Sequence, residues 1–163
     1  GIAVTYTSNP WDDPSTTTEQ IFNDIRAKMW QAIITNSKGV WKPTHLAIPQ
    51  TVESVFARPM VLGGVSLLYT LGEYVKNNLQ LEILSTVRLN SAQLAGEMAA
   101  SGTAMMFRKD PMVQRHILAR GYYENAAQMV GRDLTVLCDG VSGGLVVPQP
   151  TSVAGLARVA TAL

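Results

Sequence analysis

Charge is the scarcest property of this sequence. Asp, Glu, Lys and Arg make up only 15% of its 163 residues, and the formal net charge is +1. Soluble domains usually have about a quarter of their residues charged. A net charge this small gives no electrostatic basis for binding nucleic acid or an anionic membrane. Apolar residues reach 47%, so the composition predicts a surface that is either small or partly covered by other molecules.

Cysteine and histidine are almost absent as well. The single cysteine, Cys138, has no partner for an internal disulfide, and its apolar neighbours favour a small buried side chain over a reactive thiol. The two histidines, His45 and His116, have no second ligand at helical or zinc-binding spacing. No glycine-rich phosphate or dinucleotide loop is present. We therefore expect neither a metal nor a cofactor.

Long hydrophobic runs are also missing. No stretch approaches the roughly 18 apolar residues of a membrane-spanning helix, and no charged leader followed by an apolar segment opens the chain. These absences predict a soluble protein without a visible targeting signal. The chain begins at Gly1 rather than Met, which leaves open whether it is a whole gene product or a fragment. Its length suits one hydrophobic core rather than two ordinary domains.

The apolar spacing predicts both helices and strands. A helix is expected from about residue 17 to residue 36, because Thr16 and Glu19 form a capping box and Lys38-Gly39 gives a basic last turn and a glycine cap. Residues 1–15 are expected to be irregular, with Trp11 packed against the core. Other helices are expected at residues 49–56, 66–77 and 153–159, and a weak helix or irregular segment at 124–130. Strands are expected at residues 44–48, 81–89, 103–107 and 116–119. This order predicts an α+β fold, a mixed β-sheet with helices packed on it.

A glycine-rich segment near the end of the chain has two interpretations. Strands at Leu134–Cys138 and Leu145–Val147, joined by a turn at Gly140, Gly143 and Gly144, would form a hairpin. The same segment matches the Gly-x-Ser-x-Gly pattern of a hydrolase with Ser142 as nucleophile. That chemistry needs a helix directly after the serine and a histidine further on, and the sequence has neither. The hairpin is the favoured interpretation, and a small α/β hydrolase remains the alternative.

Other polar side chains have simple structural explanations. Asp12 and Asp13 lie among prolines, where solvation or helix capping accounts for them without an acid–base role. Arg108, Lys109 and Arg115 could form a small basic patch, but three charges without interleaved stacking aromatics are better explained as solvated loop charges than as a nucleic-acid site. The small residues at 90–102 are predicted to form a loop that is functional, mobile or an interaction surface. No catalytic residue is assigned.

The segments Leu134–Asp139 and Val146–Thr151 resemble the closing segment of tailed-phage major capsid proteins, those with the Hong Kong 97 type fold. In that family the last strand pair leads back toward a peripheral domain and ends at a Pro-Thr or Pro-Ala step. The upstream order of helices and strands is similar to the family's axial domain, the wedge that meets its neighbours at the centre of a capsomer. The resemblance covers only the carboxyl half of a typical member, without its amino-terminal arm, extended loop and spine helix.

This resemblance implies a structural subunit of an icosahedral phage or prophage shell, with residues 1–131 as an axial-domain-like core and residues 132–163 as closing strands. Implied partners are copies of the same chain, with scaffolding, protease or decoration proteins of the phage. The implied location is the virion, with the host cytoplasm during assembly. The family has no common catalytic centre, and its crosslinking lysine and asparagine have no assignable positions here. A non-viral ligand-binding domain is a further alternative.

Overall fold

The computed structural model describes residues 3–7, 9–90, 102–110, 115–124, 128–130, 133–135, 138–146, 150–157 and 159. The chain forms two compact units. The first unit combines Gly1–Lys109 with Pro150–Leu163, and the second consists of Asp110–Gln149. The expected division between residues 131 and 132 falls inside the second unit.

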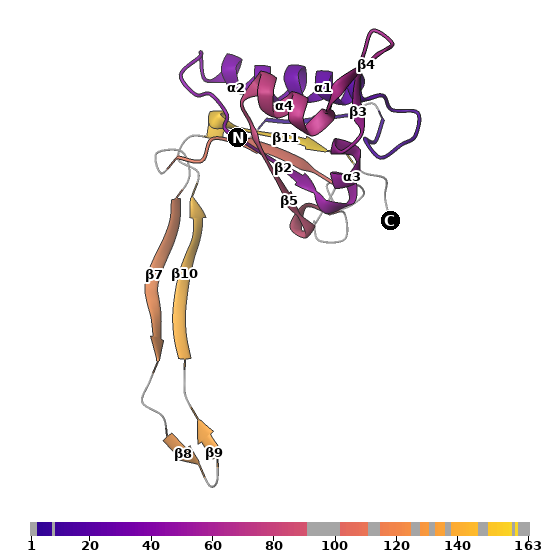
Figure 1. Cartoon of the computed structure of the whole chain (residues 1–163). Coiled ribbons are helices and arrows are strands. Elements are labelled where there is room, and N and C mark those ends of the chain that lie inside the picture. Colours follow the sequence, from indigo (N-terminus) through magenta and orange to yellow (C-terminus); the bar gives the residue numbers. More distant parts are fainter. Residues whose placement is uncertain are drawn as a thin grey trace. The chain divides into compact units, whose positions relative to one another are not determined.

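A mixed five-stranded sheet forms the centre of the first unit (Figure 1). Its strands, in spatial order, are β1 (Ala3–Tyr6), β11 (Val153–Ala157), β6 (Ala104–Phe107), β2 (His45–Pro49) and β5 (Glu82–Thr86). The outer pairs β1–β11 and β2–β5 are parallel, whereas β6 is antiparallel to both of its neighbours. The expected mixed sheet with packed helices is thereby confirmed.

The long helix predicted at residues 17–36 is present, with a change of geometry in the middle. It comprises α1 (Thr18–Asn23), a π-helical segment (Asp24–Trp30) and α2 (Gln31–Asn36). The capping box uses Thr17 and Gln20 rather than the predicted Thr16 and Glu19. Both pairs fit the motif, and tertiary contacts decide between them: Thr16 Oγ1 donates to the Pro10 carbonyl at 2.9 Å, and Glu19 accepts from the Gly63 backbone N–H at 3.1 Å.

After β2, one predicted helix is confirmed and another begins later than predicted. A 3₁₀ turn (Gln50–Val52) and the short helix α3 (Glu53–Phe56) confirm the helix predicted at residues 49–56. The helix predicted at 66–77 is wrong in its first turn, because β3 (Pro59–Leu62) and β4 (Val65–Thr70) form a hairpin there. Helix α4 (Leu71–Leu79) begins only after Thr70, whose side chain accepts from the Glu73 N–H in a capping box.

Strand β5 is shorter than predicted, since a 3₁₀ turn replaces it at Val87–Leu89. The predicted loop at 90–102 falls almost wholly outside the described residues. The helix predicted at 153–159 is wrong, because Val153–Ala157 is strand β11 between β1 and β6. Strand β1 was not predicted at all.

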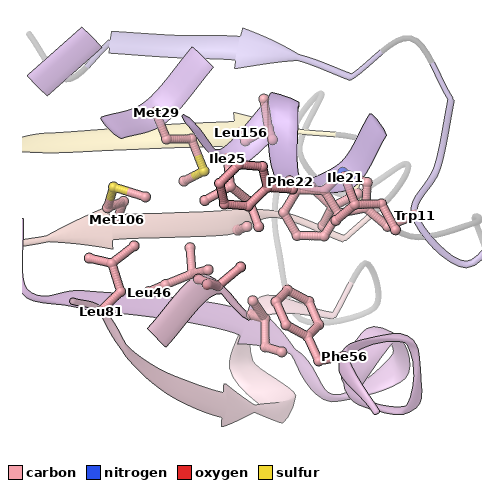
Figure 2. Packing of buried hydrophobic residues seen from close by; sticks show 14 of the residues in the cluster. Trp11, Ile21, Phe22, Ile25, Met29, Leu46, Phe56, Leu81, Met106 and Leu156 are labelled. Atoms are coloured by element: carbon pink, nitrogen blue, oxygen red, sulfur yellow. The ribbon is translucent and has the colours of Figure 1, made fainter. Parts of the chain in front are cut away.

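Helices α1, α2 and α4 lie together on one face of the sheet (Figure 1). Figure 2 shows the core between them, where Ile25 and Met29 from the long helix face Leu46 of β2 and Met106 of β6. Trp11 is fully buried at one end of this cluster, as expected from its size and its irregular segment. One apolar cluster therefore holds the long helix, the sheet and the segment before α1 together.

The described residues of the second unit form two ladders of antiparallel strands. Strands β7 (Arg115–Glu124) and β10 (Cys138–Val146) pair with each other, and β8 (Gln128–Val130) pairs with β9 (Asp133–Thr135), which lie between them in sequence. Within the segment predicted to be helical or irregular at 124–130, the described residues are the last residue of β7, Glu124, and strand β8. The predicted hairpin is also wrong: the glycines at 140, 143 and 144 lie inside β10, where the ladder to β7 has several register shifts.

Candidate functional site

Exposed apolar side chains are the most distinctive surface feature of the first unit. Five of them lie in two places. We call Val65, Leu68 and Tyr69 on β4 the hairpin surface, and Leu84 with Val87, on and just after β5, the edge surface. Leu68 has a relative exposure of 102%, so it is not packed against the described part of the chain. Clustered exposed apolar residues are typical of surfaces that bind another protein.

The hairpin surface is held in place by specific contacts at its base. Gly63 and Gly64, with φ of 55° and 83°, form the two-residue turn that this pair of positive angles allows. The Val61 N–H donates to Thr18 Oγ1 at 3.0 Å, which ties β3 to helix α1. Leu67 packs against the core, while its neighbour Leu68 points to the opposite face of β4 and into solvent. The exposed side chains are thus presented by a tethered hairpin.

The edge surface lies at the end of the sheet. Strand β5 is last in the strand order and pairs with β2 alone among the described strands. Ser85 Oγ donates to Glu53 Oε2 of helix α3 at 2.8 Å, and Thr86 Oγ1 accepts from the Arg88 N–H at 3.2 Å to start the 3₁₀ turn. These contacts fix the backbone on either side of Leu84 and Val87.

A polar cluster lies at the start of β2 and β5. His45 Nε2 is 3.1 Å from Glu82 Oε2, and His45 Nδ1 is 2.7 Å from Thr44 Oγ1. The His45 ring also stacks on Phe107, with centroids 5.5 Å apart. Both ring nitrogens are occupied by partners within the fold, which favours a structural role over an acid–base role. A shallow groove beside this cluster is also lined by Lys76, Asn77, Gln80 and Leu81.

The described residues hold no group of three or more His, Cys, Asp or Glu side chains placed to bind a metal. Their helices also contain no segment long and apolar enough to cross a membrane. Asp13 accepts hydrogen bonds from the Ser15 hydroxyl at 2.7 Å and from its backbone N–H at 2.8 Å. These bonds lower the pKa of the Asp13 carboxyl and place it in a local turn.

Ser142 lies within strand β10, opposite Leu118 of β7. The nucleophile elbow of a hydrolase needs a tight turn from a strand into a helix, and this segment is instead a strand paired with β7. The structure therefore does not provide the geometry that a serine nucleophile at this position requires.

Of the basic residues considered in the sequence, Arg108 belongs to the first unit and Arg115 to the second. Arg108 lies over the Trp41 ring at 5.5 Å.

Sequence reasoning missed both apolar surfaces. The hairpin surface had a readable signal, since a Gly-Gly pair between two apolar runs is typical of a two-residue hairpin turn. The edge surface had none, because the position of β5 at the end of the sheet depends on pairings between distant segments.

Two solved shell structures share this arrangement. The capsid of Myoviridae phage XM1 matches with a TM-score of 0.78 and 12% identity over 96% of this chain and 51% of that chain. The virus-like particle from Pyrococcus furiosus matches with a TM-score of 0.66 and 18% identity over 96% of this chain and 56% of that one. The chain therefore spans about half the length of both. No protein-family model matches it, and no curated protein matches it in sequence.

These likenesses define the fold class. The chain has an α+β fold of the kind found in viral capsid proteins. More particularly, it has a capsid fold of the Hong Kong 97 type, as its sequence resemblance implied.

Proposed function

We propose that this chain is a major capsid subunit, or part of one, that forms a phage or prophage shell by associating with copies of itself. The observation that carries the proposal is the likeness of 96% of the chain to shell-forming proteins from a phage and from a virus-like particle. A fold alone does not fix a function, so the proposal also needs support from the surface.

The surface gives independent support. The chain has few charges, and it exposes apolar side chains on the hairpin surface and on the edge surface. Capsid subunits need such areas because their neighbours cover them after assembly. Copies of the same chain are the main proposed partner, and scaffolding, protease or decoration proteins of the phage are further ones. The proposed location is the virion shell, with the host cytoplasm during assembly.

Electron microscopy tests this function. The full-length gene product, expressed alone and with the proteins encoded beside its gene, should form capsomers or closed shells. A product that stays strictly monomeric under all assembly conditions would contradict the proposal.

The alternative hydrolase function rests on Ser142 alone. A fluorophosphonate probe reacts with an activated serine and not with an ordinary one. We expect no labelling of the chain above that of the Ser142→Ala variant, because Ser142 lies in a strand. Stoichiometric labelling that Ser142→Ala abolishes would establish the alternative instead.

A further inference from the structure

Four strands of the first unit have one side without a strand partner in the described part of the chain: β1 and β5 at the two ends of the five-stranded sheet, and β3 and β4 in the two-stranded sheet. Strand β4 pairs only with β3, in a two-stranded sheet, and β5 pairs only with β2 at the end of the five-stranded sheet. An unpaired strand edge offers a row of backbone N–H and C=O groups to another chain. Among the described side chains of these four strands, only those of β4 and β5 include exposed large apolar residues, so these two edges are the candidates for adding a strand from another chain.

Both edges lack most of the features that usually prevent such pairing, although the β3–β4 ladder is irregular between its Pro59–Thr70 and Val61–Ser66 pairs. Folded proteins protect their edges with lysine, proline, bulges or very short strands. Val65–Thr70 contains no charged residue and no proline, and the single charge in Glu82–Thr86 is at its first position. Both edges instead carry exposed apolar side chains, Leu68 on β4 and Leu84 on β5.

The two edges also match each other. Strand β4 has 6 residues and β5 has 5, so each can cover nearly the whole length of the other. The hairpin projects beyond the helices, whereas β5 borders the sheet (Figure 1). With no charge in β4, pairing the two brings no like charges opposite each other.

A ring of identical subunits needs two different surfaces on each copy, because its interfaces are heterologous. A single self-complementary surface gives only a two-fold pair. The edges of β4 and β5 are two unlike surfaces on one unit, so together they meet this requirement.

We propose that strand β4 of one copy pairs with strand β5 of the next copy, so that the hairpin surface packs against the edge surface and the sheets continue around a capsomer. This inference rests on the proposed self-association and adds the pair of surfaces that carries it. Backbone hydrogen bonds between the strands supply affinity, and the apolar side chains supply the buried contact.

Cysteine crosslinking between two differently tagged copies tests the pairing. In a Cys138→Ser background, one copy carries Leu68→Cys and the other carries Leu84→Cys, or Val87→Cys as a second choice. Both positions are exposed, and circular dichroism verifies that each variant is folded. A short bis-maleimide reagent tolerates small differences in strand register. A copy with Val40→Cys is the matched control, since Val40 is also exposed but lies outside both surfaces.

We expect the mixed product of Leu68→Cys with Leu84→Cys or Val87→Cys to predominate over both homodimers and over every product with Val40→Cys. A predominant Leu68→Cys homodimer would overturn the proposal, because it would mean hairpin-to-hairpin contact. A predominant Leu84→Cys homodimer, or no product above the Val40→Cys level, would overturn it equally.

A charge at the centre of β4 gives a second measurement. Leu68→Asp should weaken self-association at least about tenfold, since burying a leucine contributes about 1.5–3 kcal/mol, whereas Val40→Asp should leave it unchanged. Sedimentation of the full-length product separates the two hypotheses. If the product associates, but Leu68→Asp does not weaken the association and the expected crosslinks do not form, the shell function is retained and this pairing is refuted. A full-length product that never associates would refute both.

Discussion

Replacing Trp11 by Ala tests how firmly the irregular segment before helix α1 is fixed. Trp11 is fully buried, and its backbone N–H donates to the Val159 carbonyl at 2.8 Å. Its ring meets Phe56 edge-on, with centroids 6.0 Å apart, and its Nε1 donates to Asp24 Oδ2 at 3.4 Å. One side chain thus connects the start of the chain, the long helix and helix α3.

The structure sets the expected size of the effect. Truncating a buried tryptophan to alanine costs about 3–5 kcal/mol, depending on how far the cavity collapses. The loss of the Asp24 contact adds little, because that bond is long and Asp24 keeps its ion pair with Lys28 at 2.7 Å. We expect Trp11→Ala to lower the free energy of unfolding by about 4 kcal/mol, a large part of the roughly 5–15 kcal/mol typical of a domain.

Urea denaturation followed by far-ultraviolet circular dichroism measures this loss without depending on tryptophan fluorescence. Trp41→Ala is the matched control, because Trp41 is only partly buried and its ring is covered by Arg108. The control should lose about 1–2 kcal/mol. Trp11→Phe, which keeps an aromatic ring, should fall between the two. If Trp11→Ala were no more destabilising than Trp41→Ala, the segment before α1 would not be part of the core, and our account of it would be wrong.

Three further predictions concern a helix end, the hairpin base and the association state. Gln80 ends α4 in the left-handed region with φ of 56°, so Gln80→Gly should raise the free energy of unfolding, measured by thermal denaturation, by about 1 kcal/mol. Asn77→Gly, within the helix, should lower the free energy of unfolding, and equal effects of the two changes would refute this. Thr18→Val removes the acceptor for the Val61 N–H and should lower the free energy of unfolding by about 1–3 kcal/mol. Amide hydrogen exchange in the hairpin should become faster, and unchanged exchange would refute our inference that this bond tethers the hairpin to α1. The 163-residue chain should sediment mainly as a monomer at micromolar concentration and unfold cooperatively. We expect one pair of short strand edges to bury much less surface than the roughly 1,200 Å² of a stable interface, and closed particles would contradict this prediction.

Local chemistry was enough to predict the elements that depend on nearby residues. The long helix has apolar residues at helical spacing and a capping motif, and both were visible in the sequence. The capping residues were misplaced by one position, because Thr16 and Thr17 both fit the motif. Thr17 caps the helix because the side chains of Thr16 and Glu19 form hydrogen bonds with the backbone of Pro10 and Gly63 instead.

Helical spacing misled the prediction where a hairpin joins a helix. Leu67, Leu68, Leu71 and Val75 fit one helical face, yet the first two lie on opposite sides of strand β4. The decisive signals were the Gly63-Gly64 turn and the Thr70–Glu73 capping box, which places the start of α4 at Leu71. Turn and cap residues were therefore better guides here than apolar periodicity.

Strands formed by distant pairing could not be predicted from their own residues. Val153–Ala157 has the small, apolar composition of a weak helix, but it lies between β1 and β6, where its residues are paired on both sides. Its partners are about 150 and 50 positions away in sequence, as the Ala3–Ala154 and Met106–Ala154 pairs show. Neither partner leaves a local signal in this segment.

The same dependence on distant pairing limits what a sequence reveals about assembly surfaces. Leu68 and Leu46 are equally apolar, yet Leu68 is fully exposed and Leu46 fully buried. The difference arises because β2 has strands on both sides and helices over it, whereas β4 has a single partner strand. Only the sheet order identifies which strands remain unpaired. If β4 and β5 pair between copies, as we propose, the residues that are exposed in one chain become part of a continuous core in the shell.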